Sequence, residues 1–144
     1  MPKGLVAEAG IVVDAPAAHV WNALVDPAIV KKYFFGTTLS CSWKKGSPIT
    51  WAGEWEGKKY QDKGIVLEIE VGRRMAYTHY SPMTGKPDVP ENYHTITVEV
   101  GGHGSHTHVT LTQDNNPDEE SREHSAKNWA MVLAGLKKVV ESAG

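Results

Sequence analysis

Hydrophobic side chains near the end of the chain recur at intervals of three and four residues, between positions 116 and 141. This spacing places them on one face of an α-helix, and the residues of that face are Ser125, Trp129, Val132, Leu133, Leu136 and Val140. Asn116 suits the N-cap, Pro117 suits the first helical position, and Glu119 completes a capping box. A helix of about 25 residues is roughly 37 Å long, so we expect it to span the protein and to bury this face.

Most of the remaining chain shows the two-residue alternation that is typical of β-strands. The predicted strands cover residues 5–14, 38–43, 47–55, 60–71, 75–80, 93–100 and 105–114. In the fourth of these strands, Ile65, Leu67, Ile69 and Val71 alternate with Val66, Glu68 and Glu70. This alternation predicts one hydrophobic face and one solvent face that carries the glutamates.

Two short helices are expected between the first two strands, over residues 17–25 and 27–34. Asp26 ends the first and caps the second, and Pro27 suits its first position. Residues 81–92 contain three prolines and a glycine and form the one long loop. Antiparallel strands with segregated helices indicate an α+β fold, with a curved seven-stranded sheet around the long C-terminal helix and one domain over residues 1–144. One helix cannot fill such a sheet, so we expect a pocket between them.

Composition argues against several classes of partner. A chain of 144 residues can bury a substantial core without metals or disulfides. Its formal net charge of -2, with both signs interspersed, gives no broad footprint for nucleic acid or anionic membrane. Cys41 is the single cysteine, and the sequence shows neither a signal-peptide pattern nor a hydrophobic run long enough for a membrane span. We therefore expect a cytoplasmic protein, monomeric or homodimeric, with no cofactor.

Three segments resemble a known superfamily, and they read APAAHVWNALVDP, DKGIVLEIEVGRRMAYTHY and NWAMVLAGLKKVVE. In this order and at these separations they are similar to the START-like helix-grip (SRPBCC) superfamily, and within it to the branch of the activator of the heat-shock-protein ATPase. The resemblance covers the chain from about residue 7 to residue 141. It places the first tryptophan of the family pattern at Trp21, the glycine opening the fourth strand at Gly64, the aromatic residue of the fifth strand at Tyr77 and the helix tryptophan at Trp129.

The resemblance implies a seven-stranded antiparallel sheet that grips the C-terminal helix around a deep cavity. In many members this cavity takes a lipid, sterol, hormone or polyketide; some relatives are cyclases or dehydratases, and the namesake of the branch works with a chaperone. Relatives often carry a second aromatic residue two positions after Tyr77, where this chain has His79. His79 thus places a titratable imidazole at a position where relatives usually have an apolar side chain in the cavity wall.

Tyr77 and His79 share a strand face that we expect to point into the pocket. The imidazole can orient a ligand, act as a general acid or base near pH 7, or be a hydrogen-bonded core residue. Trp43, Trp51 and Trp55 offer large apolar faces that suit an aromatic or alicyclic ligand, or serve as packing. The predicted ligand contacts are Trp51, Tyr77, His79, Ser125, Asn128, Trp129 and Phe34, with Met83 and Val89 of the long loop near the mouth.

The histidines near the last hairpin do not form a metal-binding pattern. His106 and His108 share a strand face, but it lies opposite Val109 and Leu111 and hence toward solvent. Cys41 has no adjacent histidine that would activate it as a nucleophile, and no phosphate-binding glycine pattern is present. We therefore expect neither a metal site nor nucleotide hydrolysis.

We expect this protein to bind a hydrophobic or amphipathic small molecule between the sheet and the C-terminal helix, and not primarily to catalyse a reaction. One alternative is a chaperone-associated protein interaction module, which needs an exposed patch on the order of 800 Å². The other is a cyclase- or dehydratase-type enzyme that uses the same cavity, which needs polar groups that converge around His79.

Overall fold

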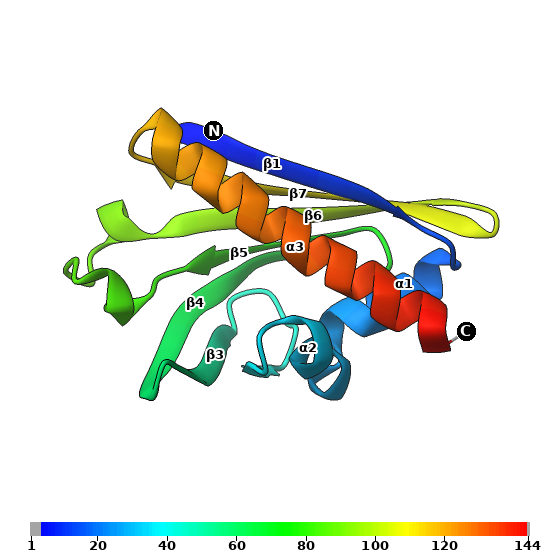
Figure 1. The fold of residues 1–144 in the computed structure, drawn as a ribbon, viewed down its shortest axis with the longest axis horizontal. Helices are drawn as coiled ribbons and strands as arrows, with labels where there is room; N and C mark the ends of the chain where they lie inside the picture. Colours follow the sequence, from blue (N-terminus) through cyan, green and yellow to red (C-terminus); the bar gives the residue numbers. More distant parts are fainter. Residues whose placement is uncertain (1–3, 144) are drawn as a thin grey trace.

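A curved antiparallel sheet lies against one long helix in the computed structural model, which describes residues 4–143 apart from the side chains of Trp55 and Ala143 (Figure 1). The elements in chain order are β1 (Leu5–Val13), α1 (Ala17–Val25), α2 (Pro27–Tyr33), β2 (Thr38–Cys41), β3 (Pro48–Trp55), β4 (Lys58–Glu70), β5 (Arg74–His79), the 3-10 turns η1 (Pro82–Thr84) and η2 (Pro90–Asn92), β6 (His94–His103), β7 (His106–Asn116) and α3 (Glu119–Ala143). The predicted α+β helix-grip fold is confirmed.

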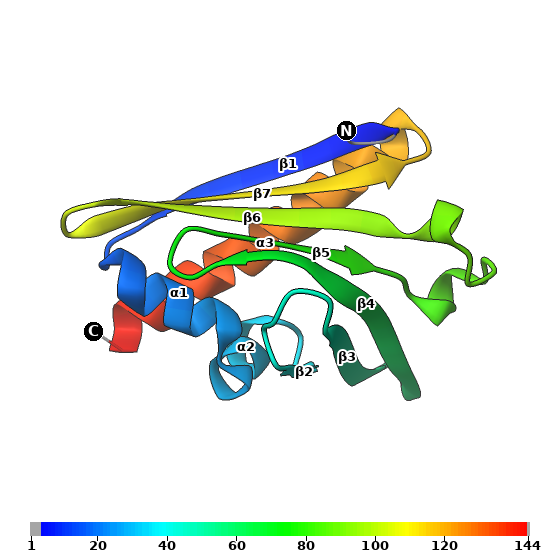
Figure 2. The same cartoon turned by 180° about the vertical axis from the view of Figure 1, so that it is seen from behind.

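The seven strands have the spatial order β1-β7-β6-β5-β4-β3-β2, and every neighbouring pair is antiparallel. Between β1 and β2 the chain passes from one edge of the sheet to the other through α1 and α2. The helix α3 crosses one face of the sheet, and from behind the strands lie in front of it (Figure 2). None of the helices in the described part of the chain is long and apolar enough to cross a membrane.

The hydrophobic core fills the space between this face of the sheet and the helices. Four side chains of this core are almost fully buried: Val98 and Leu111 of the sheet, and Leu133 and Leu136 of α3. The two-residue period of the strands and the three- to four-residue period of the helix predict this burial. Val20 of α1 joins the same cluster. The C-terminal half of α3 therefore closes the core.

The start of α3 differs from the prediction of an N-cap at Asn116. The helix begins at Glu119, and the Asp118 side chain accepts a hydrogen bond of 2.8 Å from the backbone N–H of Ser121. Asn116 instead ends β7, where it pairs with Leu5 and its side-chain amide donates to the Leu5 carbonyl oxygen. Because Asn116 takes part in the pairing of β7 with β1, the helix is capped two positions later, by Asp118.

The predicted inward face of the fourth strand is also wrong over part of its length. Ile65 and Leu67 are 49% and 42% exposed on the outer side, whereas Val66 is 1% exposed and belongs to the core. A register shift against β5 between Val66 and Glu68 changes which residues face inward. Further along, Ile69 packs against the core as predicted, while Val71 is 81% exposed in the following turn.

Gly64 allows β4 to approach β5 more closely than any other residue would. A Cβ atom built at Gly64 lies 1.7 Å from the backbone oxygen of Thr78. In the same region, the backbone N–H of Ile65 donates to the Thr78 hydroxyl at 2.9 Å. These two contacts fix the pairing of β4 with β5, the strand that carries Tyr77 and His79. Figure 2 shows that β4 curves strongly.

Replacing Gly64 by alanine is expected to lower the free energy of unfolding by about 2–3 kcal/mol, because the new methyl group overlaps backbone that cannot move independently. Chemical denaturation measures the change. Gly101→Ala is the matched control, since the nearest atom to its added Cβ is 4.0 Å away. Equal losses in the two variants would contradict the close approach as the cause.

Candidate functional site

A cavity of about 260 Å³ lies between the sheet and the N-terminal half of α3. All seven residues predicted from the sequence line it: Phe34, Trp51, Tyr77, His79, Ser125, Asn128 and Trp129. The sequence analysis missed the five other lining residues, which are Phe35, Asp62, Ile96, Gln113 and Val132. The structure thus brings the predicted residues together around one space.

Strand pairing explains how the sheet side of the cavity is assembled. Trp51 of β3 stands directly opposite Asp62 of β4, and Ile96 of β6 stands opposite both Tyr77 of β5 and Gln113 of β7. Directly opposed residues point to the same face of an antiparallel sheet. The register therefore brings residues far apart in sequence onto one wall.

Aromatic rings line much of the cavity. The Trp51 ring lies 5.3 Å from the Tyr77 ring and 5.0 Å from the His79 ring, and Phe34 meets Trp129 across the cavity edge at 5.8 Å. Burial raises the pKa of Tyr77 above its ordinary range, so its hydroxyl stays protonated. A planar apolar molecule is the kind of ligand that such a wall suits.

A smaller void of about 40 Å³ lies deeper and shares part of this wall. It is enclosed by aliphatic and aromatic side chains, among them Leu39, Ile49 and Leu133. Trp51, Tyr77 and Trp129 line both spaces. The larger cavity therefore carries the polar side chains, whereas the smaller void is lined by apolar and aromatic ones.

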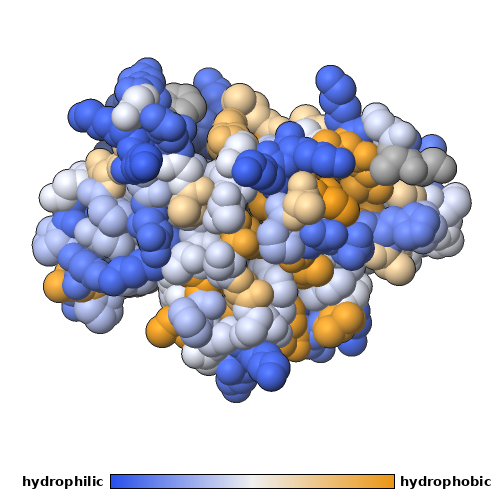
Figure 3. Space-filling model, turned by 90° about the horizontal axis from the view of Figure 1, so that it is seen from below, coloured by the Kyte–Doolittle hydropathy of each residue, from blue (hydrophilic) through white to orange (hydrophobic). Residues whose placement is uncertain are grey.

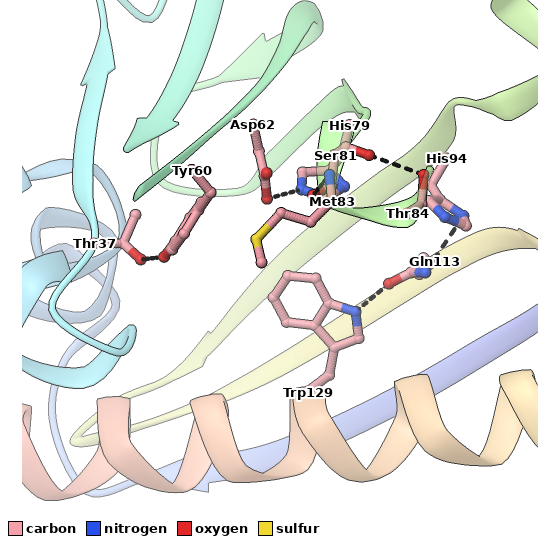
Figure 4. Close-up of polar contacts among 10 residues, drawn as sticks. All are labelled: Thr37, Tyr60, Asp62, His79, Ser81, Met83, Thr84, His94, Gln113 and Trp129. Carbon is pink, nitrogen blue, oxygen red and sulfur yellow. Dashed lines mark hydrogen bonds and ion pairs between the residues drawn. The ribbon is translucent and has the colours of Figure 1, made fainter. Parts of the chain in front are cut away.

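Asp62 and His79 form a polar pair on the cavity wall. The Nε2 atom of His79 lies 2.9 Å from Oδ2 of Asp62 (Figure 4), and the two side chains are 25% and 16% exposed. An ionised carboxylate only accepts, so Nε2 carries the hydrogen and donates it. The other carboxylate oxygen, Oδ1, is buried and has no hydrogen-bond partner among the described residues.

Gln113 links the sheet to α3 at the same end of the cavity. Its Oε1 accepts a hydrogen bond of 2.6 Å from the indole N–H of Trp129 (Figure 4), which fixes the orientation of the amide because an indole only donates. Its Nε2 lies 3.4 Å from the Ser125 hydroxyl, which in turn bonds Asn116 at 2.9 Å. These contacts hold Trp129 in place on the cavity wall.

His94 of β6 is directly paired with His79 of β5, and the centres of the two rings lie 6.4 Å apart. Its Nδ1 lies 2.8 Å from the backbone oxygen of Asp114 and donates to it. Burial lowers the pKa of His94, although the hydrogen bond to Asp114 acts in the opposite direction. The His94 side chain is therefore held in its neutral form near neutral pH.

Several other predicted positions do not line the cavity. Met83 and Val89 of the long loop are exposed, 50% and 38% respectively. Trp43 lies just beyond the end of β2, and its indole N–H donates to the Val25 carbonyl oxygen at 3.1 Å. It is one of the residues that line the inner void, but it does not line the larger cavity. The Trp55 side chain lies outside the described residues.

The histidines at the β6–β7 hairpin lie on the outer side, as predicted. His106 and His108 are exposed, and their rings lie 6.2 Å apart. Within residues 4–143, no group of three histidine, cysteine or acidic side chains is arranged to hold a metal ion.

A second hollow lies between α1, α2 and the C-terminal part of α3. It is larger, about 710 Å³, and Ile29 and Val140 contribute hydrophobic surface to it, while Lys32 and Lys138 stand among its lining residues. Figure 3 shows hydrophobic atoms gathered near the C-terminal end of the chain. None of the residues predicted for the site lines this groove.

Comparison with protein families matches residues 14–141 to the family described as activator of Hsp90 ATPase homolog 1-like protein. The chain belongs to this family. The match confirms the resemblance to the corresponding branch of the helix-grip superfamily. A comparison with curated protein sequences found no match.

Solved structures of activator-like and other proteins share the fold. The solution structure of ChR145 from Cytophaga hutchinsonii is 48% identical, with a TM-score of 0.85 over 99% of this chain and 97% of that chain. The Aha1 dimer from Colwellia psychrerythraea is 19% identical, with a TM-score of 0.74 over 95% and 96%. CalU16 from Micromonospora echinospora is 18% identical, with a TM-score of 0.70 over 97% and 86%.

The lowered pKa of His94 predicts a loss of stability in mild acid. The unfolded chain takes up a proton at this residue near pH 6.5, whereas the folded protein does so only at lower pH. The free energy of unfolding should therefore fall as the pH drops from about 6.5 through the folded pKa.

Thermal unfolding between pH 7.5 and 5 measures this effect, and His94→Asn should flatten the decline while keeping a donor toward Asp114. His103→Asn, at an exposed position of the hairpin, is the control. An unchanged pH dependence in His94→Asn would show that other groups cause the decline.

Proposed function

We propose that this member of the activator-like family binds a hydrophobic or amphipathic small molecule in the cavity between the sheet and α3. The observation that carries the proposal is the convergence of aromatic walls and a small polar end on one space of about 260 Å³. Ligand sites are typically concave and mostly apolar, with a few placed polar groups. The inner void beside Trp51 and Tyr77 offers room for an apolar extension of the ligand.

The groove between α2 and α3 supports the proposal less well than the cavity does. Lysines stand among its lining residues, and long lysine side chains keep their charged heads in water. The cavity also contains a polar pair, Asp62 and His79, that the core does not need for packing. The same fold occurs in proteins as different as the Aha1 dimer and CalU16. The fold alone therefore does not identify the ligand.

The protein should bind 2-methylnaphthalene saturably at one site, because the ring fits an aromatic wall of this kind. Asn128→Trp should weaken that binding at least about tenfold, since residue 128 lines the cavity from an exposed helical position where a large side chain can be accommodated without unfolding. Titration followed by two-dimensional NMR measures both the affinity and the site.

Met131→Trp is the matched control, because Met131 is 60% exposed on the same helix and does not line the cavity. Its affinity for 2-methylnaphthalene should equal that of the wild type. Absence of saturable binding to the wild type, or shifts confined to the groove between α2 and α3, would reject the cavity as the ligand site.

A second candidate function is a protein interaction module that acts on a chaperone ATPase. The family description favours it, and Ile65 and Leu67 supply exposed hydrophobic surface on the outer face of β4 that the sequence pattern had placed inside. Stimulation of an Hsp90-type ATPase that is lost on Leu67→Lys but kept in Asn128→Trp would support this function and place it outside the cavity.

A further inference from the structure

Asp62 carries a hydrogen-bond acceptor that the described residues leave unused. Its Oδ2 atom is engaged by His79 at 2.9 Å, while Oδ1 is buried without a partner in the part of the chain that the structure describes. Buried polar atoms are nearly always hydrogen-bonded, so an exception calls for an explanation. Because Asp62 lines the cavity, a bound molecule is one source of the missing donor.

The carboxylate is held in a defined position. The bond from His79 fixes Oδ2, and the His79 ring packs edge-on against Trp51 at 5.0 Å. Trp51 is itself directly opposite Asp62 across the β3–β4 pairing. An acceptor held from two sides costs little further ordering when a donor arrives, which favours specific recognition.

Other polar side chains of the cavity already have hydrogen-bond partners. Gln113 accepts from Trp129 and reaches Ser125, and Asn128 lies 3.3 Å from His124 on the outer side of the helix. Asp62 is the one carboxylate among the lining residues, and the described residues supply no donor to its Oδ1.

We propose, on the basis of the function proposed above, that the ligand is a ring compound bearing a hydroxyl group whose O–H donates to the carboxylate of Asp62 while its ring lies against Trp51 and Tyr77. A hydroxyl has one hydrogen to donate, which matches the single free acceptor. An ammonium group has three, and would leave two of them facing aromatic walls or competing with His79 for the carboxylate. Asp62 thus acts as the residue that selects the ligand.

The test compares the affinities of 2-naphthol, 2-methylnaphthalene and 2-naphthylmethylammonium by NMR titration of the wild-type protein. 2-Methylnaphthalene replaces the hydroxyl by a methyl group of similar size and leaves Oδ1 without a donor. We expect 2-naphthol to bind about tenfold more tightly or better, because a hydrogen bond to a buried charged group is a strong one.

Asp62→Asn should reduce this preference to about threefold or less, because an uncharged acceptor makes the weaker bond, while the affinity for 2-methylnaphthalene should stay close to that of the wild type. Asp118→Asn is the matched control: it makes the same change outside the cavity, at a helix N-cap where asparagine is equally suitable. It should keep the full preference for 2-naphthol.

Equal binding of 2-naphthol and 2-methylnaphthalene by the wild type would overturn the hydroxyl assignment and leave the proposed cavity function standing. Binding of neither compound would overturn both. Tighter binding of the ammonium compound than of 2-naphthol would also overturn the assignment, since the carboxylate would then select a cation. The three wild-type affinities decide the question even if Asp62→Asn does not fold.

Discussion

The burial of α3 against the sheet is the constraint on which the rest of the structure depends. In its C-terminal half, Leu133, Leu136 and Val140 are buried in the core, and each such side chain contributes about 1.5–3 kcal/mol by leaving water. In its N-terminal half the same face carries Ser125 and Trp129, which are only half-buried. The change along one helical face closes the core at one end and leaves the cavity at the other.

The pairing register of the strands determines the wall of the cavity that faces α3. A displacement of one residue in the pairing of β3 with β4 would place Trp51 and Asp62 on opposite faces of the sheet, so that one of them would leave the cavity. Gly64 protects the pairing of β4 with β5 in the same way, because it admits the Thr78 carbonyl at a distance that no side chain permits. Packing against α3 and pairing within the sheet therefore determine the cavity together.

The sequence predicted the elements and the aromatic wall because both follow from periodicity, as with Trp51 and Tyr77. It misplaced Ile65 because a bulge in the strand pairing has no signature in a strictly alternating pattern. It misplaced the start of α3 because the role of Asn116 in β7 depends on Leu5, which lies 111 residues away in sequence. These errors arise from tertiary contacts, which local pattern does not contain.

Asp62 lay beyond prediction for a related reason, since it stands in a charged stretch that reads as solvent-exposed, and its partner His79 is 17 residues away. A purely structural role for this carboxylate is a poor explanation, because one oxygen suffices to hold His79, and the other has no partner among residues 4–143 as described, at a cost of about 1–3 kcal/mol. Local rules are broken at sites that serve function more often than at sites that serve stability. The aromatic rings can therefore supply most of the affinity for a ligand, and the free carboxylate oxygen can determine which ligand is held and in which orientation.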